Sequence, residues 1–193
     1  MIHDFLRSRR SIRRFRPNPV PDEILRRILE TAIHAPSAHN LQPWRFVIVQ
    51  GPEARTRLAD ALTDKMRADM AAEGAPLASI KARANRSRRR LAEAPVVILL
   101  CRDTETIRRD EPEEHHMGVQ SVAAAGLQLL LAAHAEGLGG NWICWPLYAP
   151  AETSAALSLP KTWTPQAMFF LGYPAETPGE KTLRAVDDVV IRR

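Results

Sequence analysis

Two short segments near the N-terminus carry the residues with the clearest chemistry. The first, RRSIRRF at positions 9–15, places Arg9, Arg10, Ser11 and Arg13 within one loop-like run. Guanidinium groups donate paired hydrogen bonds to phosphate oxygens, so this cluster can hold a dianion. A basic run can also be a loop whose charges simply face water.

The second segment, APSAHNLQPWRF at 35–46, supplies neutral hydrogen-bonding groups beside an aromatic ring. The amides of Asn40 and Gln42 can each pair with a carbonyl and an N–H, and Ser37 is a further candidate. Asn and Ser are also common in loops for local backbone reasons alone. Together the two segments suit flavin mononucleotide (FMN), which joins a phosphate to a flat ring with a polar edge.

These two segments, with GLGGNW at 137–142 and FFLGYP at 169–174, resemble the FMN-dependent nitroreductase family in order and spacing. The resemblance covers nearly the whole chain. It implies an α+β, nitroreductase-like fold with a central mixed, largely antiparallel sheet flanked by helices. It also implies a homodimer with C-terminal exchange between the subunits.

The activity that the resemblance implies is an FMN-dependent NAD(P)H oxidoreductase. Such an enzyme takes hydride from NADH or NADPH and passes electrons to a small-molecule acceptor, which is a nitroaromatic, a quinone or a related unsaturated compound. Because the cofactor supplies the hydride chemistry, the protein needs placement and electrostatics rather than a pair of acid and base residues.

Glycines after the long apolar helix are further candidate cofactor contacts. Gly139 and Gly140 allow close backbone approach to a ligand. The resemblance places a backbone N–H of Cys144 or Trp145 opposite the flavin nitrogen that accepts hydride. Many bacterial members carry a glutamate-glycine pair there, so this chain leaves the acceptor preference open.

Basic residues near the C-terminus are the last candidates. The resemblance implies that Lys181 and Arg184 add a second basic pair at the phosphate, although two exposed charges in a loose tail are the alternative. The basic run at 81–90 favours an ordinary solvated helix with Arg88 on its surface, since no aromatic residues are interleaved. Nucleic-acid binding by a basic module remains the non-enzyme alternative.

Hydrophobic periodicity and turn residues predict the elements that position these groups. We expect helices at 3–8, 21–35, 52–72, 79–93 and 118–136, strands at 44–50, 96–101, 141–145 and 167–171, and a possible strand at 186–191. Alternating strands and helices alone would suggest a parallel sheet, whereas the family implies an antiparallel one. The helix at 118–136 is apolar almost all round, which favours a dimer interface.

Composition restricts the remaining possibilities. A chain of 193 residues with 45% hydrophobic content fits one domain over 1–193. Cys101 and Cys144 form no CxxC pair, so we expect no zinc site or disulfide and a cytoplasmic setting. The N-terminus lacks an apolar signal run, and the most apolar stretch is shorter than the roughly 20 residues of a membrane span.

Two alternative enzyme functions stay open. The chain also resembles the nitroreductase-like domain that matures a deazaflavin coenzyme, and a further subgroup fragments its own reduced flavin to make a cobalamin ligand. The sequence identifies neither the physiological acceptor nor the preferred nicotinamide.

Overall fold

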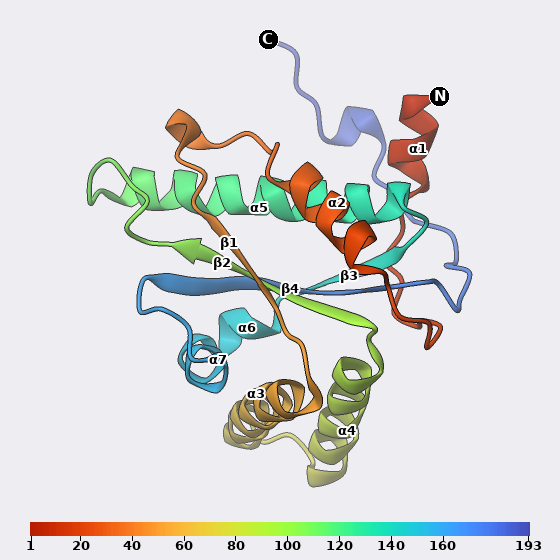
Figure 1. Ribbon diagram of the computed structural model, residues 1–193, viewed down its shortest axis with the longest axis vertical. Coiled ribbons are helices and arrows are strands. Elements are labelled where there is room, and N and C mark those ends of the chain that lie inside the picture. The colour runs from red at the N-terminus through yellow and green to blue at the C-terminus, as the bar shows by residue number, and fades with distance from the viewer.

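The computed structural model describes residues 1–193, and a four-stranded sheet lies at its centre (Figure 1). Its strands are β1 (Trp44–Ile48), β2 (Val96–Asp103), β3 (Gly139–Ile143) and β4 (Trp163–Gly172), in the order β1-β2-β4-β3. All three pairings are antiparallel, and an isolated bridge from Ser11 to Gly140 is parallel. The predicted α+β fold with a largely antiparallel sheet is confirmed.

The connection between β1 and β2 explains why the alternation of strands and helices in the sequence does not produce a parallel sheet. It contains two helices, α3 (Pro52–Ala72) and α4 (Leu77–Glu93), which pack against each other as a hairpin. One helix would return the chain for a parallel strand, whereas two helices return it for an antiparallel one. The sheet is therefore antiparallel despite a strand-and-helix pattern.

Helices cover both faces of the sheet (Figure 1). On one face lie α2 (Asp22–Ala32) and α5 (Pro112–Ala135), and on the other lie α3, α4, α6 (Trp145–Tyr148) and α7 (Pro150–Leu157). Alternate residues of β2 divide between the faces, with Ile98 and Leu100 toward α5 and Val97 and Leu99 toward α3. This double burial explains the continuous apolar run of the strand.

Helix α5 ends in a tight C-terminal turn at Gly137. The N–H of Gly137 donates to His134, and that of Leu138 donates to Ala133, with φ of +74° at Gly137. This Schellman pattern requires a left-handed residue, which glycine adopts at least cost. The expected glycine cap is present, and it turns the chain directly into β3.

In the single chain, the inner side of α5 is buried, whereas Val119 and Leu127 are 44% and 50% exposed on its outer side. Its place at a dimer interface stays a prediction. The expectation that its apolar stretch is too short for a membrane span is wrong, because α5 is long and apolar enough, but half of its most apolar stretch is buried in the protein. The burial is that of a core helix with one apolar face left uncovered.

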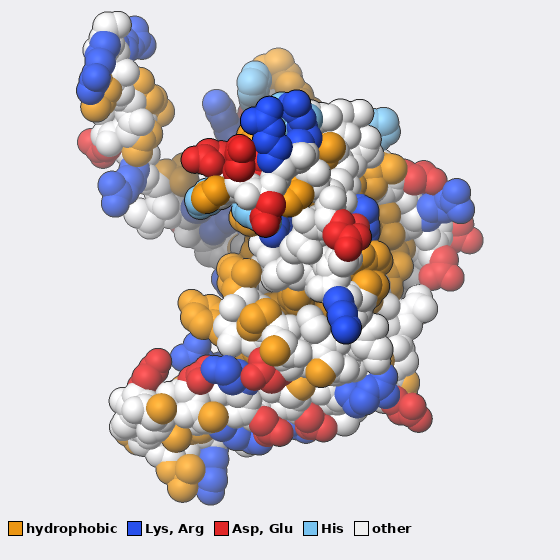
Figure 2. Space-filling model, turned by 90° about the vertical axis from the view of Figure 1, so that its left-hand side faces the viewer, with side chains coloured by type: hydrophobic (Ala, Val, Ile, Leu, Met, Phe, Trp, Pro, Cys, Tyr) orange, Lys and Arg blue, Asp and Glu red, His pale blue; other side chains and the backbone are white.

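The predicted strand at 186–191 is wrong for the single chain. Val186–Asp188 form a short 3-10 helix, and residues 179–193 are all exposed. Figure 2 shows this tail as an arm that projects from the body above a hollow, with the lobe of α3 and α4 below. A strand needs a neighbour to pair with its backbone groups, and none lies beside the tail within one chain.

Candidate functional site

The arginine loop follows the first helix, α1 (Ile2–Ser8), and is joined to the central sheet by backbone bonds. Ile12 N–H donates to the carbonyl of Gly140 at 3.0 Å, and Arg16 N–H donates to that of Tyr173 at 2.8 Å. These bonds fix the loop against the start of β3 and the end of β4. Arg9 and Arg10 are half-buried there and line a cavity of about 290 Å³.

Arg13 points elsewhere. Its backbone N–H donates to the carboxylate of Glu176 at 2.5 Å, while its side chain is on a different cavity of about 620 Å³ that also contains Arg90 of α4. The structure thus brings Arg9 and Arg10 together, but not Arg13 with them. Sequence reasoning missed Arg90, because nothing in a basic helix singles out the one arginine that faces the loop.

The packing of the protein itself requires glycine at positions 139 and 140. A Cβ on Gly139 would lie 2.7 Å from Ile12, and one on Gly140 would lie 2.6 Å from Leu130 and 2.9 Å from Leu171. Both glycines also contribute to the wall of the Arg9–Arg10 cavity. Close approach of a ligand to their backbones stays a prediction.

The amide loop at 37–42 concentrates backbone strain. His39, Asn40 and Gln42 have φ of 52°, 55° and 51°, and none of them is glycine. A non-glycine residue in this left-handed region costs about 1–2 kcal/mol. Strain of this kind persists where the surrounding structure enforces it, and it clusters at ligand-binding sites.

Two serines enforce the strained conformation. Ser37 Oγ accepts a hydrogen bond from the backbone N–H of Gln42 at 3.1 Å. Ser121 on α5 accepts one from the N–H of Ala38, also at 3.1 Å. Ser37 therefore holds the loop together. The exposed amide of Gln42 donates to that of Asn40 at 3.2 Å, and the remaining amide groups of this pair are free for a ligand.

Two buried charged residues come from β2 and α5. Arg102, 8% exposed, donates to the carbonyl of His115 at 3.0 Å, and its Nε–H has no partner. Burial lowers the pKa of Arg102. Buried Glu114 is 3.9 Å from the ring of His39, so the amide loop has one buried carboxylate beside it.

Cys144 and Trp145 lie where β3 ends and α6 begins. Cys144 is exposed, and Trp145 lines a third cavity, of about 440 Å³, with Met66, Met70 and Tyr148. Lys181 and Arg184 lie in the exposed tail and contact neither Arg9 nor Arg10 within one chain.

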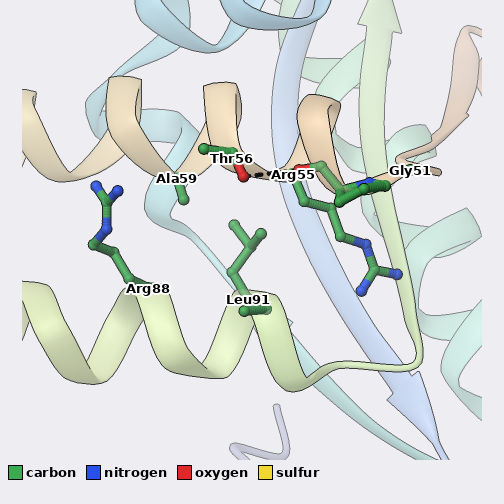
Figure 3. A pocket seen from close by; sticks show the side chains of 8 residues that line it. Gly51, Arg55, Thr56, Ala59, Arg88 and Leu91 are labelled. Atoms are coloured by element: carbon green, nitrogen blue, oxygen red, sulfur yellow. Dashed lines mark hydrogen bonds between the residues drawn. The ribbon is translucent and has the colours of Figure 1, made fainter.

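The arginines between α3 and α4 are structural. Figure 3 shows Arg55 and Arg88 at opposite ends of a cavity of about 510 Å³, above Leu91. Arg55 donates to three backbone carbonyls. Arg88 donates to Thr63 at 3.0 Å and to the carboxylate of Asp60. The expectation that Arg88 is simply solvated is therefore wrong.

The predicted residues form two separate groups along α5. Ser121 holds the amide loop and His134 lines the arginine cavity, and these residues are 13 positions apart on one helix. At 1.5 Å per residue the separation is roughly 20 Å. One chain therefore places the arginine-lined cavity and the strained loop roughly 20 Å apart along its central helix.

The antiparallel sheet, covered by helices on both faces, defines an α+β protein, and the two loops are its candidate ligand contacts. The comparison with protein families is more specific, because residues 6–173 match the model of the nitroreductase family. The chain belongs to this family, and the predicted membership and enzyme class are confirmed.

Several individual proteins are similar to this chain over most of its length. A "NADH dehydrogenase" of Thermus thermophilus is 34% identical, over 88% of this chain and 84% of the relative. A "5,6-dimethylbenzimidazole synthase" of Rhodospirillum rubrum is also 34% identical, over 87% and 79%. A crystal structure from Desulfovibrio desulfuricans, described as a nitroreductase in complex with FMN, has 29% identity and a TM-score of 0.78, and covers 100% of this chain and 96% of its own.

Proposed function

We propose that the protein is an FMN-dependent NAD(P)H oxidoreductase that reduces nitroaromatic, quinone or related unsaturated acceptors. The observation that carries the proposal is the strained loop at 37–42, which presents the amides of Asn40 and Gln42 at the surface. The D. desulfuricans structure holds FMN, and the T. thermophilus relative is named for NADH. Both names agree with the proposal.

The residues present fit FMN. The cavity beside Arg9 and Arg10 offers guanidinium donors for a phosphate, and Asn40 and Gln42 offer amides for the polar edge of the ring. Bound FMN would supply the hydride-transfer chemistry. This chain's part is to bind the phosphate, orient the ring, and keep water away from the reacting face.

We further propose a homodimer in which each cofactor lies between two chains. Three observations support it: the two groups of candidate residues are separated along α5, the outer side of α5 exposes Val119 and Leu127, and the tail exposes Leu183, Val186 and Ile191. A twofold axis across α5 would place the arginine cavity of one chain near the amide loop of the other. The tail would then cross to the partner and carry Lys181 and Arg184 there.

Mixed dimers test the shared site. Arg9→Ala and Asn40→Ala chains are each purified as defective homodimers, then unfolded together and refolded. If each site uses Arg9 from one chain and Asn40 from the other, the mixed dimer contains one intact site, and half of its FMN capacity returns. If both residues act within one chain, no intact site forms and the proposal of a shared site fails.

Cofactor identity is tested directly. Acid release and chromatography of the purified or reconstituted protein should yield FMN. Recovery of FAD, or no flavin after reconstitution, would overturn the proposed function. Turnover rates measured with NADH and with NADPH then identify the electron donor. Rates measured with panels of nitroaromatic compounds and quinones identify the acceptor. We place this reaction in the cytoplasm.

A second candidate function is fragmentation of reduced flavin to a cobalamin ligand, which the R. rubrum relative favours. Incubation of the reduced FMN-loaded protein with oxygen, followed by chromatography for 5,6-dimethylbenzimidazole, distinguishes the two functions. Maturation of a deazaflavin coenzyme remains a prediction from the sequence.

A further inference from the structure

His134, near the end of α5, forms part of the cavity that contains Arg9 and Arg10. Its ring stacks on Phe5 of α1, with centroids 5.0 Å apart and planes inclined by 28°. Its Nε2 atom lies 2.8 Å from Oγ of Ser8. Phe5 of α1 therefore packs on a face of the imidazole, and Ser8 forms a hydrogen bond at its edge. These two contacts fix the orientation of the ring in the cavity wall.

The hydrogen bonds of Ser8 determine which nitrogen carries the proton. The Ser8 hydroxyl donates to the carbonyl of Phe5 at 2.8 Å. A hydroxyl has one proton to donate, so toward His134 its oxygen is the acceptor and Nε2–H is the donor. In the neutral ring Nδ1 is then unprotonated. A second proton can bind at Nδ1 while the bond to Ser8 stays intact.

Charged groups from two other segments line the same cavity as this ring. Arg9 and Arg10 come from the loop after α1, and Glu176 comes from the segment after β4. On α5 itself, Glu136 is neutralised by Arg27, with 2.7 Å between the charged atoms. Partial burial, and then the charge of Arg9, lower the pKa of His134. Without a bound anion the ring is therefore neutral at pH 7.

We propose that His134 is the third basic group of this anion site and takes up a proton from solvent when a dianionic phosphate binds beside Arg9 and Arg10. The anion offsets the repulsion from Arg9 and favours the imidazolium. In this proposal the new Nδ1–H donates to the phosphate, while Nε2–H keeps its bond to Ser8. The inference rests on the proposed function, in which the phosphate is that of FMN.

Calorimetry measures this proton directly. FMN is titrated into apoprotein at pH 7 in buffers of different ionisation enthalpy, and the dependence of the heat on the buffer gives the protons taken up. Wild-type protein should take up a substantial fraction of a proton per FMN. His134→Gln keeps an N–H for Ser8 but cannot titrate, so the uptake should vanish and FMN affinity should fall about tenfold.

Controls separate this site from other titrating groups. His34→Gln, at an exposed histidine beyond the end of α2, should retain the full uptake. Riboflavin lacks the phosphate and should bind without proton uptake. Competition by sulfate, which remains a dianion from about pH 5.5 to 8, should strengthen on acidification in wild type but not in His134→Gln.

Histidine NMR supports the test without relying on one variant. The pKa of the His134 imidazole should rise when FMN is added, and that rise should shrink in Arg9→Gln. Binding of FMN with no uptake, or with the same uptake in His134→Gln, would overturn this inference and leave the proposed function standing. Failure of the folded apoprotein to bind FMN at all would overturn both.

Discussion

The hydroxyl oxygen of Ser37 accepts a hydrogen bond from the backbone N–H of Gln42, and this contact closes the strained loop between α2 and β1. Four residues separate them, and two of these, His39 and Asn40, share the left-handed conformation of Gln42. The Ser37 hydroxyl thus helps to fix the direction in which the amides of Asn40 and Gln42 point.

Ser37→Ala should therefore loosen the loop. It leaves the N–H of Gln42 without its partner, so we expect the free energy of unfolding to fall by about 0.5–1.5 kcal/mol. FMN affinity should fall as well, because the amides lose their fixed orientation. Urea unfolding and quenching of flavin fluorescence measure the two effects. Ser87→Ala on α4, where the hydroxyl has no hydrogen bond, is the control.

Arg9→Ala should weaken FMN binding by about 1.5–3 kcal/mol, the usual contribution of a hydrogen bond to a charged group. Riboflavin binding should change little, since the lost contact is to the phosphate. Arg13→Ala should weaken both ligands if Arg13 lies at the ring edge. Arg89→Ala, an exposed position on α4, is the matched control. Equal FMN affinity in wild type and Arg9→Ala would contradict the phosphate placement.

Gly126→Ala should destabilise the core. A Cβ there would lie 2.7 Å from Trp142 and 3.0 Å from Phe169, and these two rings pack edge-to-face with centroids 4.9 Å apart. Rigid rings cannot yield easily, so overpacking should cost about 1–3 kcal/mol. Thermal and urea unfolding measure the loss. Gly179→Ala has nothing within 4 Å and should leave stability unchanged.

The two cysteines should differ in reactivity. Cys101 is buried in β2, and burial raises its pKa to about 12, whereas Cys144 is exposed. The thiolate is the reactive form, so a thiol reagent at pH 8 should label one cysteine per native chain and two after unfolding. Cys144→Ser should abolish the native labelling. Rapid labelling of Cys101 in the native state would show that β2 opens more readily than the fold implies.

Deletion of residues 181–193 should cost both dimer stability and FMN retention. The tail exposes apolar side chains that a partner would cover, and obligate dimers bury large apolar surfaces. Light scattering at low micromolar concentration measures the first effect, and flavin content after gel filtration measures the second. A folded, flavin-loaded monomer of the full chain would contradict the proposed dimer.

Much of the fold is readable from the sequence because its signals are local. The run from Val96 to Cys101 predicts a buried strand, and Pro52 opens a helix where proline is favoured in the first turn. The helix expected at 118–136 begins earlier, at Pro112. The strand predicted at 186–191 fails for a nonlocal reason. Its residues have strand-like composition, but strand formation depends on a neighbour that the single chain does not provide.

The candidate site was less predictable, because its geometry depends on contacts far apart in the sequence. Arg9 and Arg13 look equivalent in the sequence, yet Arg9 lines the cavity beside His134, whereas Arg13 lines the cavity beside Arg90 of α4. The sequence did not identify His134 as a candidate site residue. A histidine at the end of an apolar helix points to a site only when the fold places Ser8 and Phe5 beside it.

The pairing of the N-terminal segment with the last core strand also constrains the order of events during synthesis. Ser11 is bridged to Gly140 and Phe15 to Pro174, so residues 11–15 cannot complete their pairing until residues 140–174 have been synthesised. We expect this domain to remain incompletely folded until β4 has left the ribosome.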